Sequence, residues 1–96
     1  MERVMVEIEY TGGNYCAHAP LLSGCVSIGS TLDEIKENIR EAIELHVEGS
    51  IEDGEGDLIP NVFKEEYELV YRLSTEASLK AHSNRYKKAA TKAALA

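Results

Sequence analysis

Residues 30–49 read STLDEIKENIREAIELHVEG and form the clearest predicted helix in the sequence. Thr31 stands at the N-cap position, so we expect its hydroxyl to accept from the Glu34 amide and the Glu34 carboxylate to accept from the Thr31 amide. Gly49 is expected to end the helix in the left-handed conformation. Because a helix with one apolar stripe must cover a flat apolar surface, the rest of the chain is expected to supply a sheet. The stripe recurs at helical spacing and consists of Leu32, Ile35, Ile39, Ala42, Ile43, His46 and Val47.

Three short segments before this helix alternate apolar and polar residues or stop at turn residues. Residues 3–10 alternate strictly, which predicts a strand with one buried face. Residues 11–14 contain Gly-Gly and predict a tight hairpin into a second strand over residues 15–19, which Pro20 ends. Residues 25–28 predict a third strand. The first part of the chain is therefore expected to form an antiparallel meander.

The segment after the helix returns the chain to the sheet. Residues 50–66 are rich in glycine and acid and predict a long loop, and residues 67–73 alternate again and predict a fourth strand. A strand reached through a helix normally lies parallel to its partner, here the first strand. We therefore predict an α+β fold in the order β-β-β-α-β, with one helix packed on the sheet. This domain covers residues 1–73, and residues 74–96 are expected to form a basic helical tail.

Charge is distributed unevenly along the chain, whose net charge is −7. Residues 1–71 carry 16 acidic and 4 basic residues, whereas residues 72–96 carry 1 acidic and 6 basic residues. Such an acidic domain should repel nucleic acid and attract basic partners, and the tail should do the opposite. The alternative is that the acidic surface serves solubility alone.

No segment predicts a membrane span or a secretion signal. The sequence lacks a run of about 20 apolar residues, and its N-terminus has no apolar signal-peptide core. We therefore place the protein in the cytoplasm. Cys16 and Cys25 are expected to be reduced strand residues with buried thiols.

The sequence offers no set of residues that predicts catalysis. His18, His46 and His82 lack a second histidine or cysteine at metal-ligand spacing. Glu7 and Glu9 share a strand face, yet nothing marks further acids that must converge with them on a pair of metal ions. We therefore expect neither an enzyme nor a cofactor, and a metal-dependent nuclease ranks third among the functional hypotheses.

Residues 15–48, YCAHAPLLSGCVSIGSTLDEIKENIREAIELHVE, resemble the HicB antitoxin family, and the likeness extends from about residue 4. The resemblance implies a partial, degenerate RNase H-like fold. It also implies a non-enzymatic antitoxin that binds a small basic HicA-type toxin and blocks its cleavage of mRNA. The matching residues are Tyr15, Ala17, Pro20, Leu22, Gly24, Cys25, Gly29, Thr31, Glu34, Asn38, Glu41 and Ala42.

The acidic charge and the resemblance together suggest which residues meet a toxin. The candidates are the acids of the helix and of the loop after it: Glu37, Glu41, Glu44, Glu48, Glu52, Asp53, Glu55 and Asp57.

Many members of the family also carry a C-terminal DNA-binding module and repress their own operon. The tail here resembles the start of such a module but ends before a recognition helix, so we expect DNA binding only in a longer form. The DNA-binding candidates are Arg85, Lys87, Lys88 and Lys92.

Two further expectations concern partners. A small sheet leaves open edges, so we expect a homodimer or a higher homo-oligomer through edge pairing or through the tail helices, as is typical of the family. The alternative to the antitoxin hypothesis is a stand-alone regulatory or ligand-sensing domain without a toxin.

Overall fold

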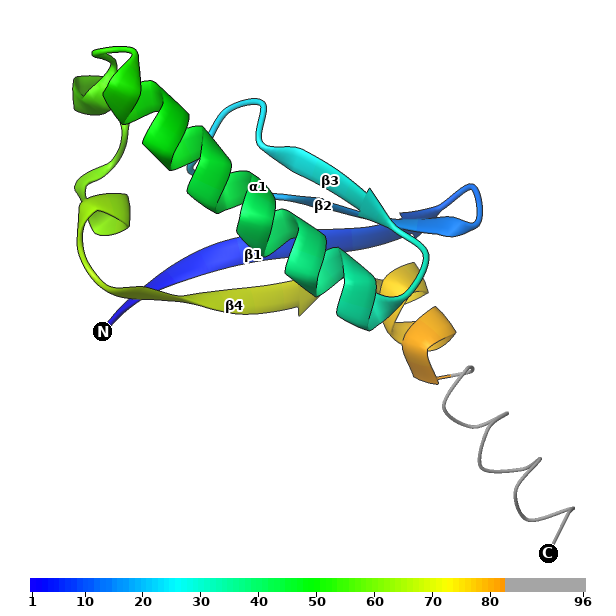
Figure 1. The fold of residues 1–96 in the computed structure, drawn as a ribbon. Helices are drawn as coiled ribbons and strands as arrows, with labels where there is room; N and C mark the ends of the chain where they lie inside the picture. The colour runs from blue at the N-terminus through cyan, green and yellow to red at the C-terminus, as the bar shows by residue number, and fades with distance from the viewer. Residues whose placement is uncertain (83–96) are drawn as a thin grey trace, which may run out of the picture.

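The computed structural model describes residues 1–82, in which one long helix lies across a four-stranded sheet (Figure 1). The predicted α+β class and the order β-β-β-α-β are confirmed. Residues 75–82 begin a further helix at the end of the described chain. The elements are β1 (Glu2–Thr11), β2 (Asn14–His18), β3 (Val26–Gly29), α1 (Leu32–Glu52), the 3-10 turns η1 (Gly56–Leu58) and η2 (Asn61–Lys64), and β4 (Tyr67–Leu73).

The strands lie in the order β3-β2-β1-β4. β1 pairs antiparallel with β2, and β2 pairs antiparallel with β3. The crossover through α1 brings β4 parallel to β1, as predicted, with Val4 beside Leu69 and Val6 beside Tyr71. Gly12 and Gly13 both have positive φ, 60° and 86°, which the tight hairpin between β1 and β2 requires.

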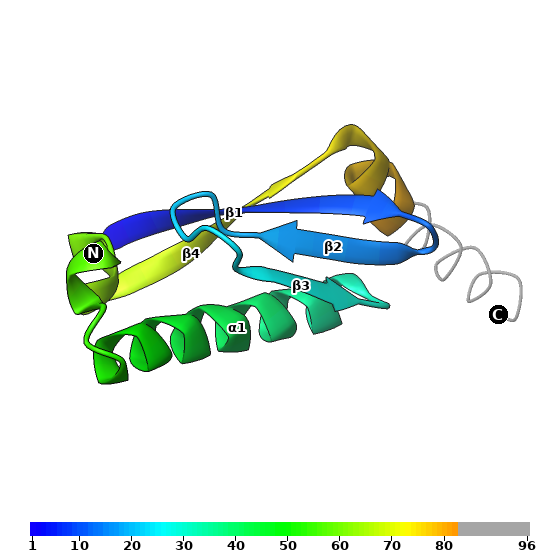
Figure 2. The same cartoon turned by 90° about the horizontal axis from the view of Figure 1, so that it is seen from above.

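The core lies between α1 and one face of the sheet (Figure 2). β1 contributes Val4, Val6 and Ile8, and each of these side chains is 0% exposed. The predicted stripe of α1 belongs to the same core cluster, with Ile35, Ile39 and Ile43 also 0% exposed. α1 packs most closely over β2 and β3. As a result, the inner side chains of β4 are only partly buried: Tyr67, Leu69, Tyr71 and Leu73.

Both ends of α1 differ in detail from prediction. Thr31 Oγ1 accepts from the Glu34 amide at 3.1 Å as expected, but Glu34 Oε1 accepts from the Ser30 amide at 3.2 Å instead of the Thr31 amide. With Thr31 extended (φ −125°, ψ 164°), the Ser30 amide is the one within hydrogen-bonding distance. Gly49 does not end the helix, which continues to Glu52. A glycine inside a helix costs only about 0.5–1 kcal/mol, and the turn comes at Gly54, whose φ is 79°.

The segment after α1 is more ordered than the predicted loop. The extra helical turn and the two 3-10 turns take up most of it. Ile59 and Phe63 are buried and fix it to the core. Phe63 also stacks edge-to-face on Tyr67, with ring centroids 5.4 Å apart. These contacts lead the chain directly into β4.

The two cysteines are free thiols in different environments. Cys25 is buried as expected, but it lies in the turn before β3 and not in the strand, because its amide donates to the Leu22 carbonyl at 3.1 Å. Cys16 lies in β2, as expected, but it is only partly buried, because alternate residues of that strand point away from α1.

Residues 75–82 pack against the end of the domain. The Ser74 hydroxyl accepts from the Ala77 amide at 3.2 Å, and Ala77 is fully buried. Lys80 Nζ lies 5.5 Å from the centre of the Tyr10 ring. None of the helices among the described residues combines the length and the apolar character that a membrane span requires.

Two glycines provide a matched test of how closely α1 approaches the sheet. A Cβ at Gly29 would lie 2.8 Å from the Ile35 backbone nitrogen, whereas a Cβ at Gly49 would meet nothing within 4 Å. We expect Gly29→Ala to lower the free energy of unfolding by about 1–3 kcal/mol, because β3 must move from α1. Gly49→Ala should raise it by about 0.5–1 kcal/mol, as expected for alanine inside a helix. Urea denaturation measures both, and equal effects would contradict the close packing of Gly29.

Candidate protein-binding surface

Four glutamates line the side of α1 that faces away from the sheet. They recur at positions i, i+4, i+7 and i+11, which places them on one face of a helix. All four are exposed. We call this set the acidic helix face: Glu37, Glu41, Glu44 and Glu48.

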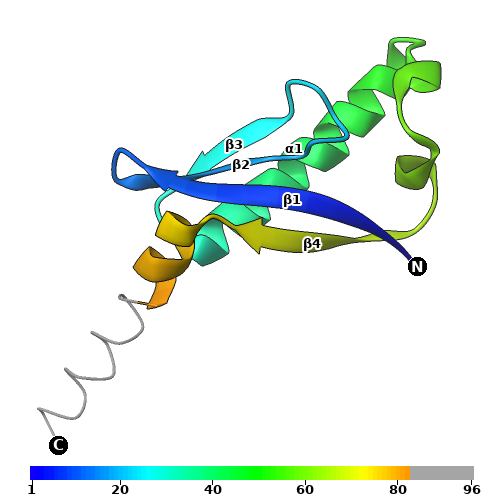
Figure 3. The same cartoon turned by 180° about the vertical axis from the view of Figure 1, so that it is seen from behind.

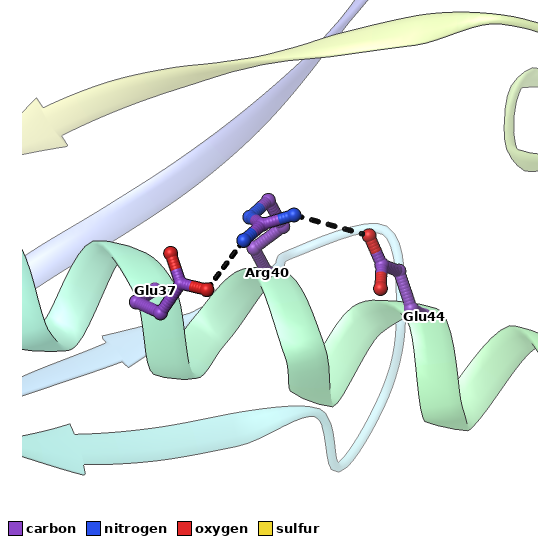
Figure 4. A network of polar contacts seen from close by, with 3 residues as sticks. All are labelled: Glu37, Arg40 and Glu44. Carbon is purple, nitrogen blue, oxygen red and sulfur yellow. Dashed lines mark hydrogen bonds and ion pairs between the residues drawn. The ribbon is translucent and has the colours of Figure 1, made fainter.

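Arg40 divides this set into paired and unpaired acids (Figure 4). Its guanidinium contacts the Glu37 carboxylate and lies 3.6 Å from Glu44 Oε1. Within residues 1–82, Glu41 and Glu48 form no ion pair. The face is therefore strongly acidic even after Arg40 is counted, and Glu41 and Glu48 are its most available charges.

The acidic surface continues past the end of the helix. We call the continuing set the acidic helix end: Glu52, Asp53, Glu55 and Asp57, all of which are exposed. The C-terminus of a helix carries the negative end of its dipole, so a carboxylate there is disfavoured by roughly 0.3–1 kcal/mol. The last turn of α1 holds no basic residue to offset this. Like charges four residues apart, as in Glu44, Glu48 and Glu52, add further repulsion.

We expect this concentration of acid to lower the free energy of unfolding of the isolated domain. Residues that are unfavourable for folding occur most often at functional sites, where they are retained because they contribute to binding. A basic partner would offset this repulsion, because its positive charges attract the same carboxylates. The acidic helix face and the acidic helix end together are therefore the candidate protein-binding surface.

Three exposed apolar side chains accompany the acids. Leu45, Ile51 and Leu58 are 68%, 52% and 77% exposed. Leu45 lies one helical turn from both Glu41 and Glu48. Binding surfaces commonly place apolar anchors among charged neighbours. The sequence pattern had already excluded Leu45 from the buried stripe, and that exclusion was the available signal for an exposed anchor.

The remaining ionisable groups do not assemble into a reactive centre in the described part of the chain. His18 Nε2 lies 3.2 Å from Glu7 Oε2 on the face of the sheet away from α1. Burial raises the pKa of the Cys25 thiol and so disfavours its reactive thiolate. Residues 1–82 contain no group of three or more histidine, cysteine or acidic side chains placed to hold a metal ion.

The structure brings the eight predicted acids onto one helix and the segment after it. The four predicted DNA-binding residues, Arg85, Lys87, Lys88 and Lys92, lie outside the described residues.

Comparison with known proteins gives this surface a context. The sequence matches a family described as "HicB_like antitoxin of bacterial toxin-antitoxin system" over residues 3–69. A UPF0150 protein of Synechocystis sp. is 50% identical over 48 residues, which is 50% of this chain and 60% of that protein. An uncharacterized 14.9 kDa protein from the rep-hol intergenic region of Haemophilus phage HP1 is 44% identical over 48 residues, 50% of this chain and 36% of that protein.

A UPF0150 protein of Archaeoglobus fulgidus is 44% identical over 45 residues, which is 45% of this chain and 65% of that protein. The chain thus spans between about a third and two thirds of the length of these curated relatives. No solved structure matches the chain.

The cost of the acidic helix end can be measured directly. We expect Glu48→Gln and Glu52→Gln each to raise the free energy of unfolding by about 0.3–1 kcal/mol at low salt, because each removes a carboxylate from the negative end of the helix. About 1 M NaCl should remove most of this gain by screening. The control is Glu37→Gln, which loses the contact with Arg40 and should leave stability unchanged or slightly lower. Stabilisation by all three variants would mean that net charge, and not position, sets the effect.

Proposed function

Because the chain belongs to the family of HicB-like antitoxins of bacterial toxin-antitoxin systems, we propose that it binds and neutralises a small basic HicA-type toxin that cleaves mRNA. The observation that carries this proposal is the set of exposed acids on α1 and after it that form no ion pair within residues 1–82. A toxin that binds RNA needs positive charge where the phosphates lie. An acidic surface competes for that same positive charge and also speeds encounter between the two proteins.

Charge alone provides attraction over a distance but limited affinity, since exposed ion pairs contribute little. The exposed Leu45, Ile51 and Leu58 supply apolar area next to the acids. In this proposal the acids orient the toxin, and the toxin buries the three apolar side chains when it binds. Leu45 lies nearest the middle of the acidic helix face, so it is the proposed central anchor.

The protein is proposed to act by binding and not by catalysis, in the cytoplasm, as a partial RNase H-like domain. In a longer form, the tail that carries Arg85, Lys87, Lys88 and Lys92 would contact operator DNA and repress the operon. A homodimer or higher homo-oligomer is proposed as the functional unit.

The first test asks whether this chain rescues cells from a toxin. If a small, basic reading frame lies beside the gene, we expect co-expression of this chain with it to restore growth and stop mRNA cleavage. Glu41→Lys, Glu48→Lys and Glu52→Lys combined should weaken toxin binding by about ten- to a hundredfold, because they reverse the charge of the surface. Calorimetry or surface plasmon resonance at several salt concentrations measures the loss.

The matched control reverses three exposed acids elsewhere, Glu2, Glu9 and Glu76, and changes the net charge equally. Equal weakening by both triple variants would show that only net charge matters and would reject the proposed surface. A neighbouring frame that proves harmless would reject the antitoxin function and favour a stand-alone regulatory or ligand-sensing domain.

A second test isolates the apolar contribution. Leu45→Ala should weaken toxin binding by about five- to thirtyfold, as expected for an anchor residue that loses about 1–2 kcal/mol, and should leave the unfolding transition unchanged because Leu45 is exposed. Leu79, which is 62% exposed on residues 75–82, is the matched control. Leu79→Ala is expected to bind as well as the parent chain. Unchanged binding by Leu45→Ala would exclude Leu45 as the anchor.

A further inference from the structure

β4 is an edge strand with one free side (Figure 3). The Ser74 amide donates to the Ile8 carbonyl at 2.8 Å, so Ser74 faces β1. Backbone groups of successive residues in a strand face opposite sides. The N–H and C=O groups that point away from the sheet are therefore those of Tyr67, Leu69, Tyr71 and Leu73. No described element pairs with this row.

A groove of about 590 Å³ runs beside the same edge. Its floor includes Tyr67, Leu69 and Tyr71, which point to the α1 side of β4, and its wall includes Arg40 and Glu44 from α1. These floor residues are only partly buried, whereas the equivalent side chains of β1 are fully buried. The edge thus combines unpaired backbone groups with uncovered apolar and aromatic area.

The opposite edge of the sheet is less open to pairing. β3 has only four residues, and its Ile28 carbonyl already accepts from Asn38 Nδ2 of α1 at 3.0 Å. A side chain that occupies an edge carbonyl blocks the approach of another strand. β4 has seven residues, a length of about 23 Å at 3.3 Å per residue. Further strand pairing is therefore expected at β4.

The sequence of β4 is complementary to itself in one antiparallel register. The backbone N–H and C=O groups that point away from the sheet must pair with the same kind of groups on the second copy. A two-fold axis that relates the two strands can therefore pass through Leu69, Val70 or Tyr71. Only the axis at Val70 places Glu68 of each copy opposite Arg72 of the other and keeps all seven residues paired. In the same register Leu69 lies opposite Tyr71, and Tyr67 lies opposite Leu73. Opposite charges and aliphatic–aromatic pairs are the favourable cross-strand combinations.

We propose that β4 pairs antiparallel with β4 of a second copy about Val70 and forms a continuous eight-stranded sheet; this inference rests on the homo-oligomer of the proposed function and names its interface. The two groove floors then meet on one face of that sheet, with an α1 helix on either side. On the other face, Glu68, which also lies 3.2 Å from Arg3 within its own chain, meets Arg72 of the second copy. Within residues 1–82, Arg72 forms no ion pair in its own chain.

A second copy fits this edge better than an extended basic segment of another protein. Glu44, Glu65 and Glu66 at the groove would attract such a segment. However, the segment would place positive charge beside Arg72, whereas a second copy satisfies both Glu68 and Arg72. The self-complementary register therefore favours a symmetric dimer.

The test is a charge exchange measured by sedimentation of the full chain over a range of concentrations. Glu68→Arg and Arg72→Glu should each weaken dimerisation by about tenfold or more, because each places two like-charged pairs across the axis. The double variant restores opposite charges and should dimerise like the parent. Mixing the two single variants should yield a heterodimer, because the arginine introduced into one chain then lies opposite the glutamate introduced into the other.

Glu9→Arg is the control, since it reverses a charge on the same face of the sheet but beyond the residues that β4 pairs with. It should leave dimerisation unchanged. Leu69→Pro removes one outward N–H without touching a donor to β1 and should also prevent pairing. A chain that remains monomeric at about 0.1 mM, where even a weak dimer would form, overturns the proposal. The proposal is also overturned if both single variants dimerise as strongly as the parent chain, or if the two single variants fail to form a heterodimer on mixing.

Discussion

The contact between the apolar stripe of α1 and the inner side chains of β1 is the interaction on which the structure depends. Ile35, Ile39 and Ile43 lie in one core cluster with β1 side chains that are also fully buried. Each buried aliphatic side chain contributes about 1.5–3 kcal/mol, which is a large share of the stability of so small a domain. Gly29 allows the first turn of α1 to approach β3 without a clash. A single helix packed this closely cannot cover four strands equally, and it lies nearest β2 and β3.

Both proposed interaction surfaces are consequences of that packing. Since only one stripe of α1 is needed for the core, its outer face is free of folding constraints and can carry acids that repel one another. Since α1 lies toward β3, the floor of β4 remains partly uncovered beside a free strand edge. The surface proposed for the toxin and the surface proposed for the second copy thus arise from one arrangement.

The sequence predicts the features that depend on periodicity. Alternation located the strands, and helical spacing located the buried stripe together with the exposed Glu37, Glu41, Glu44 and Glu48. It could not locate features that depend on the competition between local preferences. Gly49 remains helical because the next residues continue the hydrogen-bonded turns to Glu52. The presence of a glycine does not by itself show whether a helix ends there or continues. Cys25 lies in a turn because its amide bonds to Leu22, a contact that alternation does not report.

The sequence likewise did not predict that Arg40 pairs with Glu37 and Glu44, because this pairing depends on side-chain rotamers and not on spacing alone. The pairing separates the acids into two groups. Glu37 and Glu44 pair with Arg40, and Arg40 and Glu44 line the groove beside β4. Glu41 and Glu48 each lie one helical turn from Leu45. The residues proposed to bind the toxin most strongly are therefore not those beside the edge proposed to bind a second copy. A dimer formed at β4 would leave Glu41, Leu45 and Glu48 accessible on each α1, so self-association and toxin binding are compatible on the same molecule.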